Sequence, residues 1–555
     1  MRKSLASKLP EATGWIALAA LATAGLPLFL CMPVWLDVSL YDVAARNLLR
    51  GGIHYRDVFD TNPPGIVWLH VAIRSLFGWR SETIRLVDVG VVAGIIWMLV
   101  RWLRPIGMSA QIWLAVVLSA FYLSTSEWVH CQRDVWMLLP SLMALELRRR
   151  RAVRALTEQA TPARNRLEAV ADGVCWGSAC WIKPFVIIPA ATCCAVLVIG
   201  LRRRGPGTFR GMLVDHVWVV AGGALAGAAG MFWFWSTGTW PYFREVLFDW
   251  NADYWQTSEG KPLLRLVNVI LPFFPWSAVH LVAIPFAVQS VIRLLIHGPA
   301  SEADVRSLAT GLFGAFYLSW LAQAAFLQTP FPYVMAPAVL LGLTVAAGQL
   351  AGMRLSWVGK VALAGSLLAA MAFHPLFRWQ RTALWARCLR EGSTAELRDR
   401  LTLLAPEPHP TGWEELETVR DYLRSLRLSD GQLTCYNNST HSLYLDLGLR
   451  PSTRFLHFDT VLERFPHHRE EVRQALASSR QLYVVADLRK LGCKHSEEKD
   501  SPELRLPVDF PGPWRAVYPW NEELVFRTER FAVFRMVKPV EALAPKRTSD
   551  RDAID

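Results

Sequence analysis

The sequence predicts an α-helical polytopic membrane protein with a small α/β domain at its C-terminal end. Of the 555 residues 52% are apolar, and several apolar runs reach the roughly 20 residues needed to cross hydrocarbon. From about His374 onward the apolar runs shorten to strand length and the charge becomes mixed. Net charge is +12, but the basic residues gather between the apolar runs, where they act as topology signals, so we expect no nucleic-acid partner.

The apolar runs predict about eleven transmembrane helices in residues 1–374. The least secure boundary is the break at Lys183-Pro184, which separates two short runs. The predicted spans are 14–36, 83–101, 109–124, 134–147, 169–182, 184–201, 213–236, 266–292, 307–328, 332–350 and 355–374. The first run is longer than the apolar region of a signal peptide and lacks a small-residue cleavage site, so we interpret it as a retained anchor.

Arginine-rich segments predict the orientation. The densest are Arg148 to Arg151 and Arg202 to Arg204, and both fall on the N-terminal side of the alternation of spans. Because cytoplasmic loops carry an excess of Lys and Arg, we expect a cytoplasmic N-terminus. The loops 37–82, 125–133 and 237–265 are then extracytoplasmic, and an odd number of spans places the C-terminal region on that face too.

The C-terminal region from 375 to 540 has the pattern of a small α/β domain. The segments QLTCYNN and QLYVVADL are typical of strands, and FPHHREEVRQALASS is typical of an amphipathic helix. Residues 541–555 are polar, so we expect a disordered tail. There is no GxxxxGK[ST] or GxGxxG motif, and the nine cysteines lack metal-site spacing, so neither a nucleotide cofactor nor a zinc site is expected.

The first extracytoplasmic loop, Asp37 to Gly65, is unusually charged for a connector. Asp37 lies at the exit of the first span, where partial desolvation can tune a carboxylate for general-base chemistry; alternatively, it only terminates the span. The segment DVAARNLLRGG resembles an amphipathic helix that lies on the bilayer, with Arg46 and Arg50 toward lipid head groups. Asn62-Pro63-Pro64-Gly65 then forces an extended turn.

The succession D-x-x-x-Y, amphipathic helix, Y-R-D-x-F-D-x-x-P-P-G resembles the first extracytoplasmic loop of the GT-C glycosyltransferases. The similarity is greatest to the family 39 type, which includes protein O-mannosyltransferases and the lipid A aminoarabinose transferase. The resemblance implies a GT-C-like membrane fold and an inverting transfer of a sugar from a polyprenyl-phosphate donor to a glycan, lipid or protein acceptor. It makes Asp37 the catalytic base. Residues implied to bind substrate in this loop are Tyr41, Arg56, Asp57 and Asp60.

Three later segments extend the resemblance. In SEWVHCQRDVWMLLP, Asp134 resembles the second acidic site of the family, although a helix cap beside a snorkelling Arg133 is an alternative. His130 and Asp134 are four residues apart and would share a helical face, so a divalent cation held with Asp37 or Asp60 is considered. Candidates to meet the carrier phosphate or to pack near the carrier are Lys183, Arg244 and Tyr333.

The chain departs from the family pattern at two positions, and other functions stay open. Asn62 stands where relatives often have a basic residue before Pro-Pro, and Val38 where an acidic residue frequently follows the key Asp. A transporter or flippase of a lipid-linked substrate is one alternative, because such proteins place polar residues near the midplane of the membrane. The residues that could serve this function are Glu146, Lys183 and Asp215. A non-catalytic membrane scaffold is a third interpretation. The resemblance points to a bacterial inner or plasma membrane.

Overall fold

The computed structural model forms two compact units, each built from separate stretches of the chain. Unit 1 comprises Met1–Val38, Asn62–Thr237 and Glu259–Pro410, and unit 2 comprises Ser39–Thr61, Gly238–Ser258 and Thr411–Asp555. The structure describes residues 2–156, 162–202, 206–253, 267, 271–298, 305–329, 331–351, 365–366, 368–370, 372, 379–402, 412–488, 518–519 and 522–536. The expected tail 541–555 and most of the expected span 355–374 lie outside these residues.

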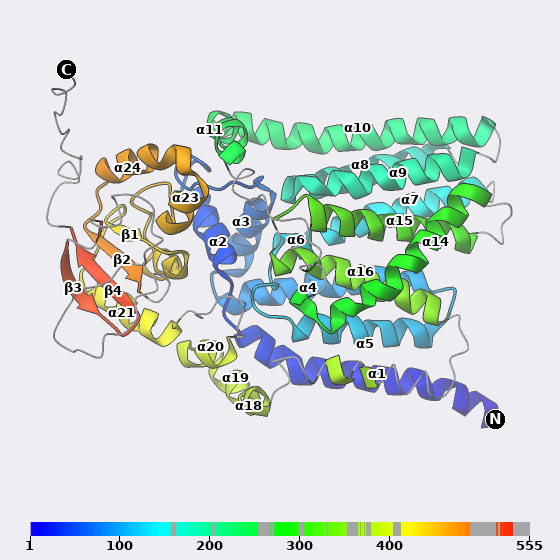
Figure 1. Cartoon of the computed structure of the whole chain (residues 1–555), viewed down its shortest axis with the longest axis horizontal. Helices are drawn as coiled ribbons and strands as arrows, with labels where there is room; N and C mark the ends of the chain where they lie inside the picture. The colour runs from blue at the N-terminus through cyan, green and yellow to red at the C-terminus, as the bar shows by residue number, and fades with distance from the viewer. Residues whose placement is uncertain are drawn as a thin grey trace, which may run out of the picture. The chain divides into compact units, whose positions relative to one another are not determined.

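Unit 1 is a bundle of long helices that run side by side (Figure 1). Its main helices are α1 (Arg2–Cys31), α3 (Gly65–Phe77), α4 (Ser81–Val100), α5 (Met108–Ser124), α6 (Arg133–Trp136), α7 (Leu138–Leu156), α8 (Pro162–Ile182), α9 (Ile187–Leu201), α10 (Pro206–Ser236), α14 (His280–His297), α15 (Val305–Phe326) and α16 (Pro332–Leu350). Short helices are η1 (Arg101–Leu103), η2 (Pro184–Val186), η5 (Leu271–Phe273), η6 (Trp276–Val279), α18 (Trp379–Thr382), α19 (Trp385–Glu391) and α20 (Ala395–Leu401).

Seven helices in the described part of the chain are long and apolar enough to cross a membrane. They are Pro10–Cys31, Ser81–Leu103, Pro184–Leu201, Arg210–Ser236, Trp276–His297, Val305–Phe326 and Pro332–Leu350, with Gly65–Phe77 and Met108–Ser124 as shorter apolar helices. The chain is therefore an integral, multi-pass membrane protein, as predicted. The count of about eleven spans stays a prediction.

Burial separates the centre of the bundle from its periphery. In α15 and α16, 78% and 72% of the most apolar window is buried, whereas in Arg210–Ser236 of α10 only 17% is buried. Since most of α10 is apolar and exposed, its outer face is suited to lipid.

Helices α8 and α10 pack closely through glycine. A Cβ atom added at Gly173 of α8 would lie 1.9 Å from the carbonyl oxygen of Val219, and one at Gly222 of α10 would lie 2.1 Å from that of Val170. Backbone atoms cannot move aside as a side chain can, so both positions require glycine. Small residues of this kind let helices in membranes approach each other.

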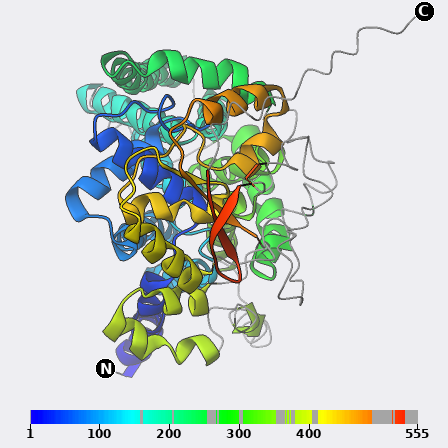
Figure 2. The same ribbon diagram turned by 90° about the vertical axis from the view of Figure 1, so that its left-hand side faces the viewer.

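Unit 2 contains the predicted α/β fold around a four-stranded sheet. The strands are β1 (Leu433–Cys435), β2 (Tyr483–Asp487), β3 (Glu523–Arg527) and β4 (Phe531–Arg535), in the order β1-β2-β4-β3. β1 and β2 are parallel and the other pairs antiparallel, with an irregular register between Leu524 and Phe526. The strands and the helix predicted from sequence are present as β1, β2 and α24, and Figure 2 faces β3 and β4.

Unit 2 also contains short helices, of which α21 and η9 contact the sheet. They are α11 (Trp240–Glu245), η4 (Val246–Trp250), α21 (Trp413–Ser425), η9 (Asn438–Thr440), α22 (Ser442–Leu447), α23 (Phe458–Arg464), η10 (Pro466–His468) and α24 (Arg469–Ala477). Tyr422 of α21 stacks on Phe526 of β3, with ring centroids 4.3 Å apart. Inside, Arg530 donates to Asp487 at 2.6 Å, and both side chains are almost fully buried.

Unit 2 is not the contiguous segment 375–540 delimited by composition, because two earlier segments are part of its core. The ring of Phe59 lies 4.4 Å from Trp250, 5.5 Å from Phe455 and 5.6 Å from Phe465, measured between centroids. Arg454 donates to Glu245 at 2.6 Å. Three stretches that are distant in sequence therefore share one apolar core.

At Val43 the bilayer-facing orientation expected for the helix after Tyr41 is wrong. That helix is α2 (Leu36–Leu49), and protein covers Val43, which is 3% exposed, whereas Leu49 at the end of the same helix is exposed. Arg46 donates to the carbonyl of Leu445 at 2.5 Å and Arg50 to that of Gly448 at 2.7 Å. The two arginines thus hold segment 39–61 to the rest of unit 2 instead of facing head groups.

Candidate functional site

Asp37 lies at the start of α2, at one end of unit 1. It occupies the first helical turn, where the positive end of the helix dipole favours a carboxylate. The side chain is partly exposed, and its Oδ2 accepts a hydrogen bond of 3.5 Å from Nε2 of Gln132. Asp37 is therefore ionisable and accessible, which are the properties a general base needs.

A buried ion pair lies next to this carboxylate. Nζ of Lys183 is 2.6 Å from Oδ1 of Asp134, and the Asp134 side chain is fully buried. Within the described residues, Oδ2 of Asp134 has no hydrogen-bond partner. Lys183 is also close enough to Asp37 to be influenced by its charge. Two of the predicted catalytic residues and one predicted phosphate ligand thus come together in unit 1.

Lys183 lies between α8 and η2, where the helix is broken before Pro184, as predicted from the sequence. Burial lowers the pKa of Lys183 to about 8, while the carboxylate of Asp134 opposes this shift. At pH 7 most of the amine is protonated, and it loses its proton as the pH rises through about 8. An amine of this kind can stabilise an anion and is sensitive to mild alkali.

The turn Asn62-Pro63-Pro64-Gly65 brings α3 against the end of α8. A Cβ atom added at Gly65 would lie 2.5 Å from the backbone of Trp181, two residues before Lys183. Because that neighbour is backbone, no side chain larger than hydrogen fits without displacing α3. The glycine of the P-P-G motif therefore has a packing role beside the ion pair.

Two charged residues near the start of α4 organise the second loop, and the sequence analysis did not single them out. Arg85 donates to the carbonyls of Phe29, at 3.1 Å, and Pro33, which fixes the chain just before Asp37. Asp88 accepts hydrogen bonds from Tyr122 Oη at 2.7 Å and from Trp136 Nε1 at 2.6 Å. Their signal in the sequence was the presence of two charges inside a predicted span.

The predicted helical face shared by His130 and Asp134 is wrong. His130 precedes α6 in a turn where Cys131 has a φ of 60°, so the two residues are not on one helix. The His130 ring nitrogens lie 3.3 Å from Nη1 of Arg85 and 2.9 Å from Oγ1 of Thr125. Among the described residues no group of three His, Cys, Asp or Glu side chains could hold a metal ion. The ring of His130 therefore contacts Arg85 and Thr125, and its position does not support a bound divalent cation.

Aromatic side chains lie beside Asp37. Tyr333 is buried and stacks on Phe331 with centroids 5.5 Å apart, and its ring is 6.1 Å from that of Trp128. Trp128 in turn lies 5.2 Å from Trp35, which is two residues before Asp37. Tyr333, expected to pack near a carrier, is thus connected through aromatic contacts to the segment that carries Asp37.

The other predicted binding residues lie in unit 2. Asp57 closes its own loop: Oδ2 accepts from the Ile53 amide at 2.7 Å, and Oδ1 pairs with Nε of Arg56 at 2.6 Å. Although burial opposes it, these bonds lower the pKa of Asp57. Tyr41 and Asp60 are buried, whereas Arg244 is exposed.

His54 is not a basic group of the loop. Its side chain is 1% exposed, and burial lowers its pKa to about 3. The ring is therefore neutral at physiological pH.

Comparison with solved structures shows the fold. The chain is similar to ArnT from Cupriavidus metallidurans bound to undecaprenyl phosphate, with 16% identity, coverage of 94% of this chain and 98% of ArnT, and a TM-score of 0.58. The apo state of ArnT gives the same identity and coverage with a TM-score of 0.54. No family model matches the sequence, and no curated protein matches it. The predicted GT-C-like membrane fold is confirmed.

The Asp134–Lys183 pair makes a prediction about stability. Asp134→Asn leaves a buried amine without its counter-charge, and we expect a loss of about 3–5 kcal/mol in the free energy of unfolding. The double variant Asp134→Asn/Lys183→Met removes both charges and recovers most of this loss. Thermal unfolding of the purified full chain in detergent, followed by tryptophan fluorescence, measures both.

The matched control is Arg164→Ala, which breaks an exposed ion pair with Glu168. Because exposed pairs contribute little, we expect a change below about 1 kcal/mol. Equal unfolding temperatures for wild type and Asp134→Asn would show that the buried pair does not hold the site together.

Proposed function

We propose that the protein is an inverting glycosyltransferase. It moves a sugar from a polyprenyl-phosphate donor to a hydroxyl of a glycan, lipid or protein acceptor on the extracytoplasmic side of the membrane. The observation that carries the proposal is the partly exposed carboxylate of Asp37 beside the buried Asp134–Lys183 pair. The similarity in fold to an ArnT structure that contains undecaprenyl phosphate supports the class of donor.

Asp37 acts as the general base. Its carboxylate takes the proton from the acceptor hydroxyl while that oxygen attacks the anomeric carbon of the donor sugar. The new glycosidic bond forms as the bond from the anomeric carbon to the phosphate oxygen breaks, so the configuration inverts and polyprenyl phosphate leaves. Gln132 orients the carboxylate through its hydrogen bond to Oδ2.

Lys183 stabilises the departing phosphate. The leaving group gains negative charge as the sugar bond breaks, and a preorganised cation nearby lowers the energy of that state. Asp134 holds the ammonium group in position at 2.6 Å. Lys183 is the best supported of the basic candidates, because it lies near Asp37 and next to Asp134 within unit 1. Binding roles for Tyr41, Arg56, Asp57, Asp60, Arg244 and Tyr333 remain proposals.

The transporter alternative has less support. One of its polar candidates, Glu146, accepts hydrogen bonds from Arg149 and Arg150 of its own helix at 2.8 and 2.9 Å. Lys183 is engaged with Asp134. Glu146 and Lys183 are thus both engaged in ion pairs. A scaffold function would leave the Asp37 loop tolerant of substitution, which the following experiment tests.

We expect Asp37→Asn to abolish sugar transfer, because general-base catalysis contributes about 10²–10⁴-fold to a rate and the amide cannot accept the proton. In a strain lacking the protein, mass analysis of lipid-linked sugars should show one accumulated donor, which also identifies the sugar. Wild type removes the accumulation, and Asp37→Asn leaves it.

Asp249→Asn is the matched control, since it makes the same change at an exposed position of unit 2. It should restore wild-type levels of the lipid-linked sugar. Full restoration by Asp37→Asn, at equal protein abundance in the membrane, would remove this residue from the mechanism.

The pKa of Lys183 predicts a pH dependence. As pH rises through about 8 the amine loses its charge, so affinity for polyprenyl phosphate should fall, by about tenfold if one charge-assisted bond is lost. Titration of purified protein with polyprenyl phosphate at pH 7, 8 and 9 measures this. Lys183→Arg stays charged and should show a flat profile between these values. A wild-type profile as flat as that of the arginine variant would exclude Lys183 as the phosphate ligand.

The orientation follows from the arginine clusters. We propose a cytoplasmic N-terminus, with Asp37 and the C-terminal part of the chain outside the cytoplasm, as in a bacterial inner or plasma membrane. A reporter enzyme active only outside the cytoplasm should be active when fused after Asp555. The same reporter placed before Met1 should be inactive. Activity in the reverse arrangement would overturn the orientation, and equal activity of the two fusions would overturn the odd number of spans.

A further inference from the structure

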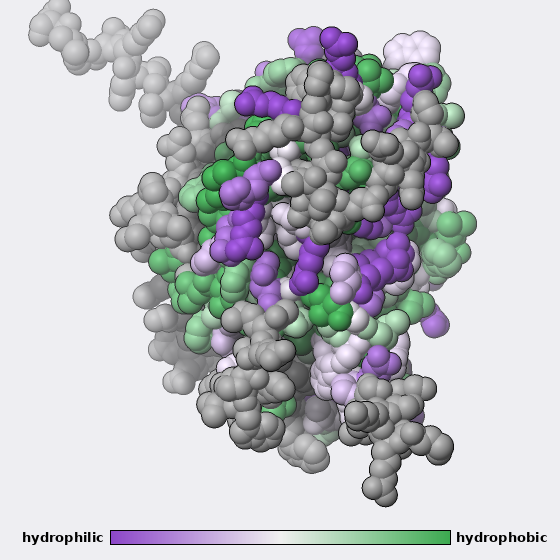
Figure 3. All heavy atoms as spheres, turned by 90° about the vertical axis from the view of Figure 1, so that its right-hand side faces the viewer, coloured by the Kyte–Doolittle hydropathy of each residue, from purple (hydrophilic) through white to green (hydrophobic). Residues whose placement is uncertain are grey.

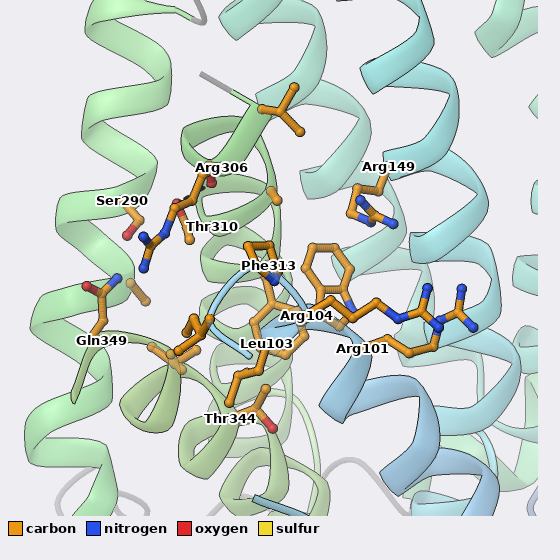
Figure 4. A pocket seen from close by; sticks show the side chains of 18 residues that line it. Arg101, Leu103, Arg104, Arg149, Ser290, Arg306, Thr310, Phe313, Thr344 and Gln349 are labelled. Atoms are coloured by element: carbon orange, nitrogen blue, oxygen red, sulfur yellow. Dashed lines mark hydrogen bonds between the residues drawn. The ribbon is translucent and has the colours of Figure 1, made fainter. Parts of the chain in front are cut away.

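A cavity lies between helices of unit 1, and the proposed sugar transfer makes no use of it. Its volume is about 350 Å³, and its walls come from η1 with the residues after it, α7, α14, α15 and α16. Figure 4 shows that Arg306, Ser290 and Gln349 lie on one side, whereas Arg101 and Arg104 lie on the other. Pockets for small ligands in proteins begin at about 300 Å³, so a compact polar group fits.

The lining is strongly basic. Four arginines face the cavity, Arg101, Arg104, Arg149 and Arg306, and none of its lining residues among those described is acidic. Arg101 and Arg149 share Glu146, at 3.5 and 2.8 Å. Within the part of the chain that the structure describes, the guanidinium groups of Arg104 and Arg306 form no ion pair. The described lining of the cavity is therefore positively charged.

This cavity is remote from the Asp37 site. Arg85, which fixes the chain before Asp37, and Arg101 are sixteen residues apart on one helical span, Ser81–Leu103. At about 1.5 Å per residue this separates them by roughly 24 Å. The cavity is bounded by the last turns of Ser81–Leu103 and α16 and by the first turns of α15, so it lies at the level of one membrane surface.

The end of unit 1 that bears these residues combines charge with apolar surface. Figure 3 shows hydrophilic side chains in purple gathered at this end among hydrophobic ones in green. The cavity itself combines the arginines with apolar groups such as Leu103, Pro105 and Phe313. Beside the cavity, the guanidinium group of Arg101 lies 4.6 Å from the ring centroid of Trp97, and this tryptophan is exposed. A ligand with a charged head and an apolar tail matches both features.

We propose that this cavity binds the phosphate head group of an anionic glycerophospholipid, whose acyl chains lie against the exposed apolar surface beside Trp97. Arg104 and Arg306 supply positive charge that no ion pair among the described residues engages. Ser290 and Gln349 offer hydrogen bonds to the glycerol and phosphate oxygens. Basic pockets between transmembrane helices at a membrane surface recognise such head groups. The site is separate from the donor site because it lies at the opposite end of the Ser81–Leu103 span.

Native mass spectrometry of the delipidated full-length protein, titrated with phosphatidylglycerol or phosphatidylcholine, tests the proposal. We expect one tightly bound phosphatidylglycerol and weaker binding of the zwitterionic lipid. Arg104→Ala/Arg306→Ala should weaken phosphatidylglycerol binding by about 30-fold, since each basic group near an anionic lipid contributes a factor of about five. Ala309→Phe fills the cavity without changing charge and should also weaken binding.

The control variant Arg164→Ala/Arg166→Ala removes two exposed arginines that do not line the cavity. It should bind phosphatidylglycerol as wild type does. Equal binding by the cavity variants and the control variant overturns the proposal. Displacement of the lipid by millimolar inorganic phosphate also overturns it, because the cavity would then take a soluble anion. Asp37→Asn should bind the lipid normally, so failure of the proposed transferase function and failure of this site are distinguishable.

Discussion

The burial of a lysine beside the membrane is the constraint on which the site depends. Lys183 cannot remain charged in a dry environment without a counter-ion, and Asp134 supplies it at 2.6 Å. This pair ties the second loop to the break between α8 and η2, and Gly65 packs against the residues just before that break. The segment that carries Asp37 is then held from the other side by Arg85. Removing one charge of the pair therefore destabilises the packing of the second loop and of the α8–η2 break near Asp37.

Much of the fold could be predicted from the sequence, since hydropathy and periodicity report directly on burial. The boundaries of α4, α9 and α16 match the predicted apolar runs. β2 and α24 match segments whose apolar residues recur at the spacing of a strand and of a helix. The resemblance singled out Asp37, Asp134 and Lys183, which the structure brings together in unit 1. An apolar face does not reveal what covers it, however. In the helix that was expected to lie on the bilayer, Val43 is covered by protein.

Other parts could not be predicted because they depend on contacts between distant residues. Nothing in the local pattern indicates that Phe59 and Trp250 complete the core of a unit whose sheet begins at Leu433. Sequence spacing also misled the interpretation of His130, because four residues place two side chains on one face only if the helix is continuous. Arg85 and Asp88 could have been recognised, since charges inside an apolar span are seldom accidental.

The discontinuous make-up of unit 2 has a consequence for biosynthesis. Arg46 leaves the ribosome 399 residues before its acceptor Leu445, which corresponds to roughly 20–80 s at ordinary elongation rates. During that interval Phe59 and Trp250 lack Phe455 and Phe465, so two apolar segments wait uncovered while later helices insert. A nascent chain that stops before residue 455 would therefore expose apolar side chains that chaperones and proteases recognise. Truncation of the C-terminal region would destabilise the first loop as well as the sheet of unit 2.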